Sequence, residues 1–223
     1  MSDRTFSYMS TDWLQGHEVF IEKFMEHADV RFFKKGEFLF RQNENLNELF
    51  LILKGTIESF FESESGKQKI TSIIRRGMLV GMAGLNDYEG HHTLRCRTAV
   101  IAGVMPKEAV YEWDSAMLLA LIQMQTRKIR ATYIQMMNQS SQTIETRILN
   151  FLLEAGLNED EPGPVEIPVS IEFSKQEIAN IISSTRERVN QIINDLEKRR
   201  IIQTEGKEIR FYPSKVRNLL TLK

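Results

Sequence analysis

The sequence predicts an α+β protein: a β-rich N-terminal domain, one long helix, and a C-terminal domain of short helices and strands. Three observations predict this class. Short apolar runs with glycine turns recur about every ten residues before Trp113. No Gly or Pro interrupts Ser115 to Gln142, and two separately capped helical segments follow Phe173. The expected divisions are 1–114, 115–142 and 143–223.

The composition is that of an ordinary soluble globular protein, with 42% hydrophobic and 26% charged residues among 223. No apolar stretch reaches the roughly 18 residues that cross a bilayer, and the polar N-terminus lacks the order of a signal peptide. The single cysteine, Cys96, excludes an internal disulfide. We therefore expect a cytoplasmic protein with no membrane partner.

The net charge of −1 conceals an uneven distribution. Residues 184–223 contain ten Lys or Arg against five Asp or Glu, whereas the rest of the chain contains nineteen against twenty-five. A basic segment is thus attached to an acidic body. Such a segment favours a polyanionic partner, although the whole-chain charge does not.

The N-terminal region begins with an amphipathic pattern over residues 14–27, which predicts a short helix. The strands that follow are bounded by glycine turns and polar loops, which is typical of a barrel or sandwich. They are expected at Phe32–Phe40 (strand, turn, strand), Leu49–Leu53, Thr56–Glu62, Lys69–Ile74 and Ala99–Met105.

The long helix expected over 115–142 has one apolar seam. Its members are Leu118, Ile122, Ile129, Tyr133 and Met136, with Leu121, Met124 and Met137 beside them. A domain of this size has little need of so long a helix, so a partner helix and a homodimer are the favoured interpretation. The alternative is a core helix packed only on the β-rich domain.

The C-terminal segment contains two short helices that are each preceded by a capping signal. Ser174 to Glu177 forms a capping box, and we expect a second box from Ser184 to Glu187. Two such helices joined by a short turn predict a helix-turn-helix. A helix over Ile144–Ala155 comes first, then a loop over 157–164 that contains two prolines. Ile201 to Tyr212, with Gly206 between apolar runs, predicts a two-stranded wing.

The second of these helices has polar side chains near its N-terminus, namely Arg186, Arg188, Asn190 and Gln191. That end of a recognition helix enters the major groove of DNA. Arg suits guanine, Glu suits the amino group of cytosine, and Asn or Gln suits adenine. Lys207 and Arg210 on the wing are placed to reach phosphates. The alternative is a pair of amphipathic helices whose charges are only solvated.

The chain resembles the Crp–Fnr family of transcription regulators along nearly its whole length. The matching stretches are Lys35-Gly36-Glu37, Leu51-Ile52-Leu53-Lys54-Gly55, Ser65-Gly66-Lys67, Ser174 to Ala179 and Ser184 to Val189. The resemblance implies a jelly-roll-like β-roll of the cyclic nucleotide-binding type, a dimerisation helix and a winged helix-turn-helix. It also implies a homodimer that binds palindromic double-stranded DNA and contacts RNA polymerase. In this family an effector in the β-roll reorients the DNA-binding domains.

The resemblance also implies which residues contact each ligand. The DNA-contact residues are Ser174, Lys175, Ser184, Thr185, Arg186, Glu187, Arg188, Asn190, Gln191 and Lys207. In the cyclic-AMP receptor branch a second Arg stands where this chain has Gln191, so we expect one base pair of the half-site to differ, with adenine preferred there.

The same resemblance implies that the effector-contact residues are Gly81, Met82, Ala83, His92, Thr93, Thr132 and Tyr133. Cyclic-nucleotide binders have Gly-Glu and, about ten residues later, Arg-Ser or Arg-Thr, for the ribose and the cyclic phosphate. Met82 and His92 replace the Glu and the Arg, and Arg95 or Arg97 would serve only after a register shift. We therefore expect an unknown small molecule rather than cyclic AMP.

Other sensing chemistries of the family are also disfavoured. The iron–sulfur branch uses several N-terminal cysteines, and none is present here, so an iron–sulfur cluster is excluded. A haem branch uses Cys or His in the β domain, and His91, His92 and Cys96 lie close together in the sequence. A histidine pair in a loop is more often solvated, and a lone cysteine in a strand is more often a small core residue. No metal site is expected.

Two other functions remain open alongside an effector-controlled regulator. One is a regulator active without a ligand, and the other is a ligand-binding module whose C-terminal domain docks a protein. No nucleophile–base pair, phosphate-binding glycine loop or metal-ligand spacing is present, so we do not expect an enzyme.

Overall fold

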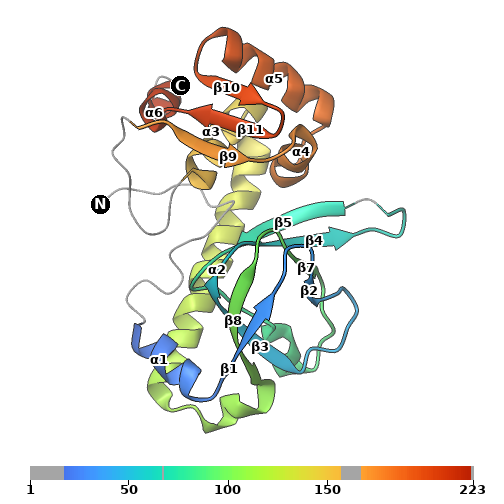
Figure 1. The fold of residues 1–223 in the computed structure, drawn as a ribbon, viewed down its shortest axis with the longest axis vertical. Coiled ribbons are helices and arrows are strands. Elements are labelled where there is room, and N and C mark those ends of the chain that lie inside the picture. The colour runs from blue at the N-terminus through green and yellow to red at the C-terminus, as the bar shows by residue number, and fades with distance from the viewer. Residues whose placement is uncertain (1–17, 67, 157–166, 222–223) are drawn as a thin grey trace. The chain divides into compact units, whose positions relative to one another are not determined.

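The computed structural model describes residues 18–66, 68–156 and 167–221 (Figure 1). The chain forms two compact units that divide between Ala131 and Thr132, within the long helix α2 (Ser115–Ser141). The expected helix over 115–142 is thereby confirmed. No helix in these ranges is long and apolar enough to span a bilayer.

The N-terminal unit is built on two antiparallel sheets of four strands each, with strand orders β1-β8-β3-β6 and β2-β7-β4-β5. The expected β-rich domain is confirmed. Its strands are β1 (Asp29–Phe33), β2 (Phe38–Phe40), β3 (Glu48–Lys54), β4 (Ile57–Glu62), β5 (Gln68–Ile74), β6 (Leu79–Val80), β7 (Thr93–Cys96) and β8 (Val100–Pro106). Two 3-10 helices, η1 (Met82–Asn86) and η2 (Lys107–Glu112), interrupt them.

Strand β3 explains why the run Leu49–Leu53 is apolar without alternation. Phe50 and Ile52 point into the core between the two sheets, where Ile57, Leu94 and Cys96 also lie. Leu49 and Leu51 point to the opposite face, which helices cover. Because both faces of β3 are buried, every position is apolar.

The helices that cover the outer face of the first sheet are α1 (Glu18–Glu26) and the first half of α2. Phe20 and Phe24 of α1 pack against Trp113, with ring centroids 5.4 and 6.2 Å away. Residues 18–26 of the expected 14–27 helix are thus confirmed, and residues 14–17 lie outside the described ranges.

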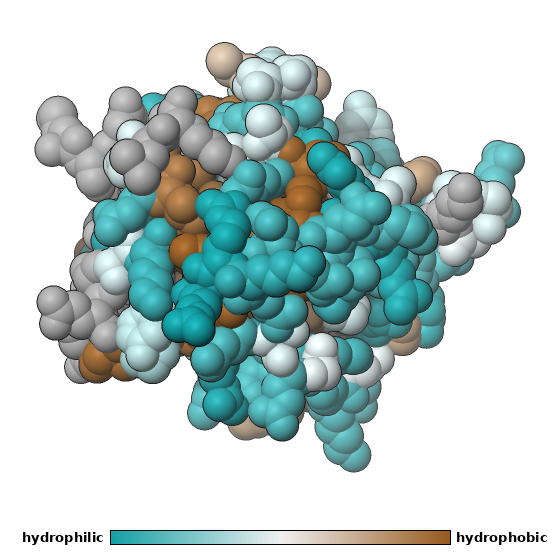
Figure 2. All heavy atoms as spheres, turned by 90° about the horizontal axis from the view of Figure 1, so that it is seen from above, coloured by the Kyte–Doolittle hydropathy of each residue, from teal (hydrophilic) through white to brown (hydrophobic). Residues whose placement is uncertain are grey.

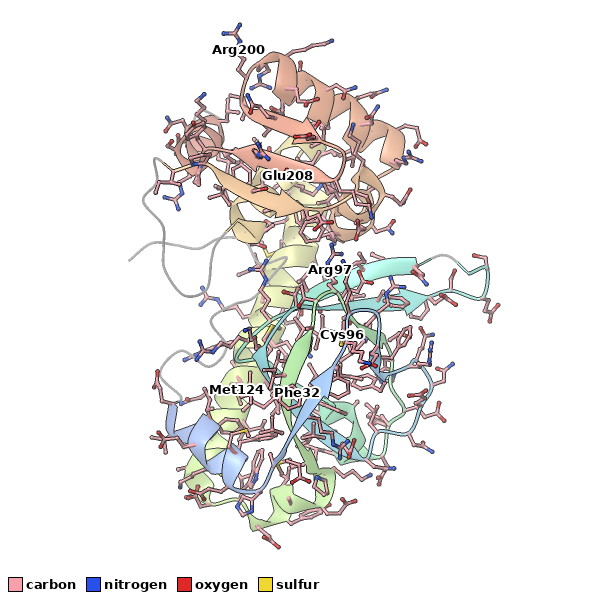
Figure 3. All side chains as sticks on the ribbon, in the orientation of Figure 1. Phe32, Cys96, Arg97, Met124, Arg200 and Glu208 are labelled. Atoms are coloured by element: carbon pink, nitrogen blue, oxygen red, sulfur yellow. The ribbon has the colours of Figure 1, made fainter. Side chains whose placement is uncertain are left out.

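Helix α2 has two apolar faces. Met117, Leu121 and Met124 are buried against the sheet, and Figure 3 shows Met124 at this contact. The predicted seam, from Leu118 through Ile122, Ile129 and Tyr133 to Met136, is instead exposed, with 39% to 63% of each residue accessible. The seam therefore does not pack against the sheet.

The C-terminal unit continues with helices around a three-stranded antiparallel sheet of order β10-β11-β9 (Figure 1). Its elements are α3 (Ile144–Ala155), β9 (Val169–Glu172), α4 (Lys175–Ile182), α5 (Arg186–Lys198), β10 (Ile202–Glu205), β11 (Glu208–Phe211) and α6 (Pro213–Thr221). The expected helices and the wing are present. Strand β9 and helix α6 were not predicted, and the loop over 157–164 lies outside the described residues.

Candidate DNA-binding surface and effector site

Helix α4 begins at the predicted capping box. The Ser174 hydroxyl accepts a hydrogen bond from the Glu177 amide at 3.2 Å, and a Glu177 carboxylate oxygen accepts one from the Ser174 amide at 2.8 Å. Ile178, Ala179 and Ile182 are fully buried behind this start. The small side chain of Ala179 suits a position where α4 packs closely, as the sequence predicted.

The second predicted capping box is wrong by one residue. Ser183 adopts a left-handed conformation with φ of 55°, and this ends α4. The N-cap of α5 is then Thr185, whose hydroxyl accepts a hydrogen bond from the Arg188 amide at 3.2 Å. The Ser184 hydroxyl is buried and has no hydrogen-bond partner among the described residues. The turn geometry, which sequence spacing does not specify, moves the cap from Ser184 to Thr185.

The face that α5 presents to solvent carries the expected base-reading residues. Val189, Ile193 and Leu196 are buried, as the apolar spacing predicted. Arg186, Glu187 and Gln191 are exposed, while Asn190 is partly buried. The Arg188 guanidinium donates a hydrogen bond to the Gln191 side-chain oxygen at 3.1 Å. The first two turns of α5 therefore present donors and an acceptor together.

Two arginines that the sequence reasoning missed hold α5 and α4 in place. Arg147 of α3 is buried and donates to the Ile182 carbonyl at 2.7 Å, at the end of α4. Arg199 bridges Glu145 and Asp195 at 2.8 and 3.1 Å, and these carboxylates raise its pKa. Position 147 lies on the apolar stripe of α3. A charged residue at such a position is the sequence signal that could have indicated a buried, hydrogen-bonded arginine.

The wing turns at Gly206, where φ is 61°, and Lys207 is exposed beside it. Arg210 is already paired on the wing, because both its Nε and Nη2 donate to the Glu208 carboxylate at 2.9 Å. This pairing raises the pKa of Arg210 and lowers that of Glu208. Figure 3 marks Glu208 on β11. Lys207 is thus the better phosphate-contact candidate of the two.

The residues expected to contact an effector in the N-terminal unit lie at η1 and at the start of β7. Gly81, with φ of 94°, caps η1, and a Cβ there would stand 2.3 Å from the Glu48 carbonyl oxygen. Met82 begins η1, and Gln125 of α2 directs its amide at the Met82 sulfur. A thioether is only a weak hydrogen-bond acceptor, unlike the carboxylate that would bind a sugar hydroxyl.

His92 and Thr93 have surroundings that differ from a phosphate cradle. Burial lowers the pKa of His92, and the nearby charges of Lys128 and His91 lower it further, so the ring is neutral near pH 7. Thr93 is buried, and its hydroxyl accepts from the Gln42 amide at 3.0 Å. Neither group offers the permanent positive charge that a phosphate favours.

The two arginines that a register shift would supply are already paired. Glu58 of β4 is buried and forms ion pairs with both Arg95 of β7 and Arg97, which follows that strand. Arg95 also lies over the Phe60 ring, 5.1 Å from its centroid. If either arginine turned away to bind a ligand, the buried Glu58 carboxylate would lose one of its ion-pair partners, which costs free energy.

Thr132 and Tyr133 are exposed residues of α2 in the C-terminal compact unit. They therefore belong to a different unit from Gly81, Met82, Ala83, His92 and Thr93. A groove of about 610 Å³ does occur in the N-terminal unit, lined by Phe32, Phe38 and Arg41 among others, and none of the expected effector residues lines it.

The cysteine and histidines singled out in the sequence do not share one environment. Cys96 lies in the core between the sheets, as Figure 3 shows, and burial raises the pKa of its thiol to about 11. A thiol of that kind stays protonated and unreactive at neutral pH. His91 is exposed. The described residues contain no group of three or more His, Cys, Asp or Glu that is arranged to hold a metal ion.

Comparison with known proteins agrees with this architecture. Residues 30–113 match the model of the cyclic nucleotide-binding domain, and residues 146–212 match that of the Crp-like helix-turn-helix domain. The combination of these two domains defines a class of DNA-binding transcription regulators. The chain belongs to the Crp/Fnr family within that class.

Two relatives and two solved structures illustrate the likeness. The transcriptional activator protein Anr of Pseudomonas protegens is 27% identical over 180 residues, covering 79% of this chain and 73% of that protein. The cAMP-activated global transcriptional regulator CRP of Salmonella typhimurium is 26% identical over 200 residues, covering 86% and 93%.

Among solved structures, a CRP/FNR-family regulator from Thermus thermophilus superposes with a TM-score of 0.74 at 19% identity, covering 86% of this chain and 98% of that one. The c-di-GMP responsive regulator CLP of Xanthomonas campestris gives 0.71 at 19%, covering 87% and 98%. At these identities the structures establish the fold.

The position of the α5 cap leads to a first prediction. Thr185→Ala removes the hydroxyl that satisfies the Arg188 amide, so the free energy of unfolding should fall by about 1 kcal/mol. Ser184→Ala removes a buried hydroxyl without a partner, so unfolding should be unchanged or slightly harder. Urea denaturation of both variants measures the difference, and a larger loss for Ser184→Ala would contradict the cap at Thr185.

Proposed function

We propose that the chain is a homodimeric regulator that reads a palindromic DNA site with the N-terminal half of α5 and is controlled by a small molecule bound in its N-terminal unit. Residues 1–114 would sense, 115–142 would dimerise and 143–223 would bind DNA. The observation that carries the proposal is the capped helix pair of α4 and α5, with its exposed Arg186, Glu187 and Gln191.

The base-reading role follows from the chemistry of that exposed set. Arg186 supplies two parallel donors, which match the acceptor pair of guanine, and Glu187 accepts from the cytosine amino group. The Gln191 amide provides both a donor and an acceptor, which suits adenine. Its contact with Arg188 holds the side chain toward the N-terminal turn of α5. Ser174, Lys175 and Lys207 would contact phosphates or sugars and set the register.

A binding-site selection from random duplexes tests this role. Arg186→Ala should weaken binding to the selected site by about 10- to 100-fold and relax one position, because a bidentate base contact is lost. Gln191→Ala should relax a different position.

Lys34→Ala, a loss of one exposed charge in the N-terminal unit, is the matched control and should leave the selected sequence unchanged. If no sequence is enriched by the native protein at low salt, the DNA-reading role is wrong, and docking of a protein becomes the better explanation of the C-terminal unit.

Dimerisation is supported by the exposed seam of α2. Five apolar residues at helical spacing face solvent, although the same helix buries a separate apolar face on the sheet. A parallel copy of α2 would remove this seam from water, at roughly 1.5 to 3 kcal/mol for each fully buried large side chain. A palindromic site contains the same half-site twice. A protein that binds it therefore needs two copies of its recognition helix, related by the symmetry of a dimer.

A charge placed on the seam should break the dimer. Ile129→Glu is expected to raise the dimer dissociation constant at least about 100-fold, because an unpaired carboxylate would be buried at the interface. Gln123→Glu adds the same charge on an exposed position of α2 beside the seam and should have little effect. Sedimentation equilibrium measures both, and a dimer that survives Ile129→Glu would show that another surface joins the subunits.

The effector is proposed to be a small molecule other than cyclic AMP. Two similar proteins respond to different ligands, since one is cAMP-activated and the other is c-di-GMP responsive. In this chain Met82 lacks a carboxylate, His92 is neutral, and Arg95 and Arg97 are paired with Glu58. These residues therefore do not offer the contacts that the cyclic phosphate and the ribose of cyclic AMP would need.

Thermal unfolding with cyclic AMP tests this choice. Native protein should show no rise in melting temperature, whereas a ligand at 100 times its dissociation constant stabilises by about 2.7 kcal/mol. The double variant Met82→Glu with His92→Arg restores the two groups that cyclic-nucleotide binders use, and it should gain stability with cyclic AMP. Stabilisation of the native protein would overturn the proposal, while a library of phenolics and other small molecules serves to find the true effector.

Its relatives are transcription regulators, and we propose that this protein likewise acts by binding, without catalysis, in the cytoplasm and in contact with RNA polymerase. A regulator that binds DNA without any effector remains the second candidate, because Arg95 and Arg97 are paired with Glu58 and Cys96 is packed in the core.

A further inference from the structure

We propose that the groove along β1 and β2 in the N-terminal unit binds a small organic cation that carries an apolar ring. This groove, called the edge groove below, has a volume of about 610 Å³ and is lined by residues of the two strands and of the turn that follows each. None of the residues expected to contact the effector lines it. The site is therefore additional to the proposed effector site and does not rest on the proposed function.

The edge groove lies where the two sheets of the N-terminal unit are not joined by a further strand. Strand β1 is the outermost strand of the order β1-β8-β3-β6, and β2 is the outermost strand of the order β2-β7-β4-β5. The turn between them passes through Gly36, with φ of 89°. Each strand thus has one edge without a partner strand among the described residues, which leaves room for another molecule.

Four phenylalanines line the edge groove and differ in how they are held. Phe33 and Phe40 pack against Phe50 of the core, with ring centroids 6.4 and 6.2 Å apart. Phe32, which Figure 3 marks on β1, is 75% exposed. The base of the groove is thus fixed by the core, while the Phe32 ring is accessible to a ligand.

The fourth ring, Phe38, already carries a cation of the protein itself. The Arg41 guanidinium lies over this ring, with its central carbon 3.7 Å from the ring centroid. A cation within about 6 Å of a ring face is attracted by the quadrupole of the ring. The edge groove therefore accommodates a planar cation on one aromatic face, and the exposed Phe32 ring offers a second one.

The charged residues of the edge groove favour a cationic ligand over an anionic one. Two carboxylates, Glu37 and Glu44, line it against the single guanidinium of Arg41, which leaves one net negative charge. Within the described ranges, no Lys, Arg or His forms an ion pair with either carboxylate. An organic cation would supply the missing positive charge.

Both carboxylates are held in place by backbone amides. The Lys34 amide donates to Glu37 at 2.7 Å, and the Arg41 amide donates to Glu44 at 2.8 Å. Each bond uses the Oε2 atom, so the Oε1 atom remains open to a ligand that donates hydrogen bonds. Lys34 and Lys35 belong to the same turn as Glu37, but neither lines the groove.

The size and lining of the edge groove fit a small molecule better than a nucleic acid. Ligand pockets commonly have volumes of about 300 to 1,000 Å³ and apolar walls with a few polar groups. Its net negative charge would repel a phosphate backbone. Hydrophilic side chains dominate the face of the molecule in Figure 2, which looks onto the end that carries α5 and β10 in Figure 1. The phenylalanine lining distinguishes the edge groove from that face.

Three probes with the same phenyl ring and different charges test the proposal on the full-length protein. They are phenethylammonium, phenylacetate and 2-phenylethanol, which are cationic, anionic and neutral at pH 7. Isothermal titration calorimetry should show that phenethylammonium binds at least about 10-fold more tightly than either of the others, because only it can donate charged hydrogen bonds to the carboxylates. Amide chemical shifts of Gly36, Arg41 and Glu44 should move with its binding.

Two variants separate the contributions of charge and ring. Glu37→Gln with Glu44→Gln keeps an acceptor oxygen for each backbone amide and removes both charges, so affinity for phenethylammonium should fall at least about 10-fold. Phe32→Leu replaces an exposed ring by an aliphatic side chain and should weaken binding about 2- to 5-fold through the lost cation–π attraction. Unchanged melting temperatures show that both variants fold.

The charge-matched control is Glu22→Gln with Glu26→Gln, two exposed carboxylates of α1 that do not line the edge groove. This control should bind phenethylammonium as the native protein does. An equal loss in the control and in the groove variant would overturn the proposal. So would equal or tighter binding of phenylacetate or 2-phenylethanol, no binding of phenethylammonium, or binding that leaves the groove amides unshifted. Each of these results would leave the proposed DNA-binding function intact, because the edge groove shares no residue with it.

Discussion

The two apolar faces of α2 are the constraint on which the rest of the structure depends. One face, with Met117, Leu121 and Met124, completes the core on the outer side of the first sheet. The other face is exposed from Leu118 to Met136. The described residues bury only one of these faces, and the proposed homodimer would bury the other, which the hydrophobic effect favours. A symmetric DNA site would then follow from the symmetry of the protein.

In the C-terminal unit, the helix proposed to read DNA, α5, buries Val189, Ile193 and Leu196 and is also held by polar contacts at its ends. The start of α4 is held by a reciprocal cap at Ser174, and its end by the buried guanidinium of Arg147. Helix α5 is held by Thr185 at one end and by the Arg199 bridge at the other. These polar contacts leave Arg186 and Gln191 free to face solvent, which a reading surface requires.

Charge is distributed in the N-terminal unit so that the usual cyclic-nucleotide chemistry lacks its partners. Glu58 engages Arg95 and Arg97 together, and burial keeps His92 neutral. These pairings are the reason for proposing an effector other than cyclic AMP, or a regulator that needs none. Because few polar contacts define a small-molecule site, changing two or three of them changes the ligand class while the sheets stay the same.

The sequence by itself determined the element order, the capping box at Ser174, the buried stripe of α5 and the seam of α2, because each depends on local spacing along the chain. It misplaced the second cap and did not reveal β9, α6 or the role of Arg147. The cap depends on the left-handed turn at Ser183, whereas β9 and the role of Arg147 depend on contacts between residues distant in sequence, such as Ile209 beside Ile171 and Arg147 beside Ile182. Only the tertiary structure decided which arginines are neutralised and which remain available, since an ion pair such as Glu58 with Arg95 joins strands that are 37 positions apart.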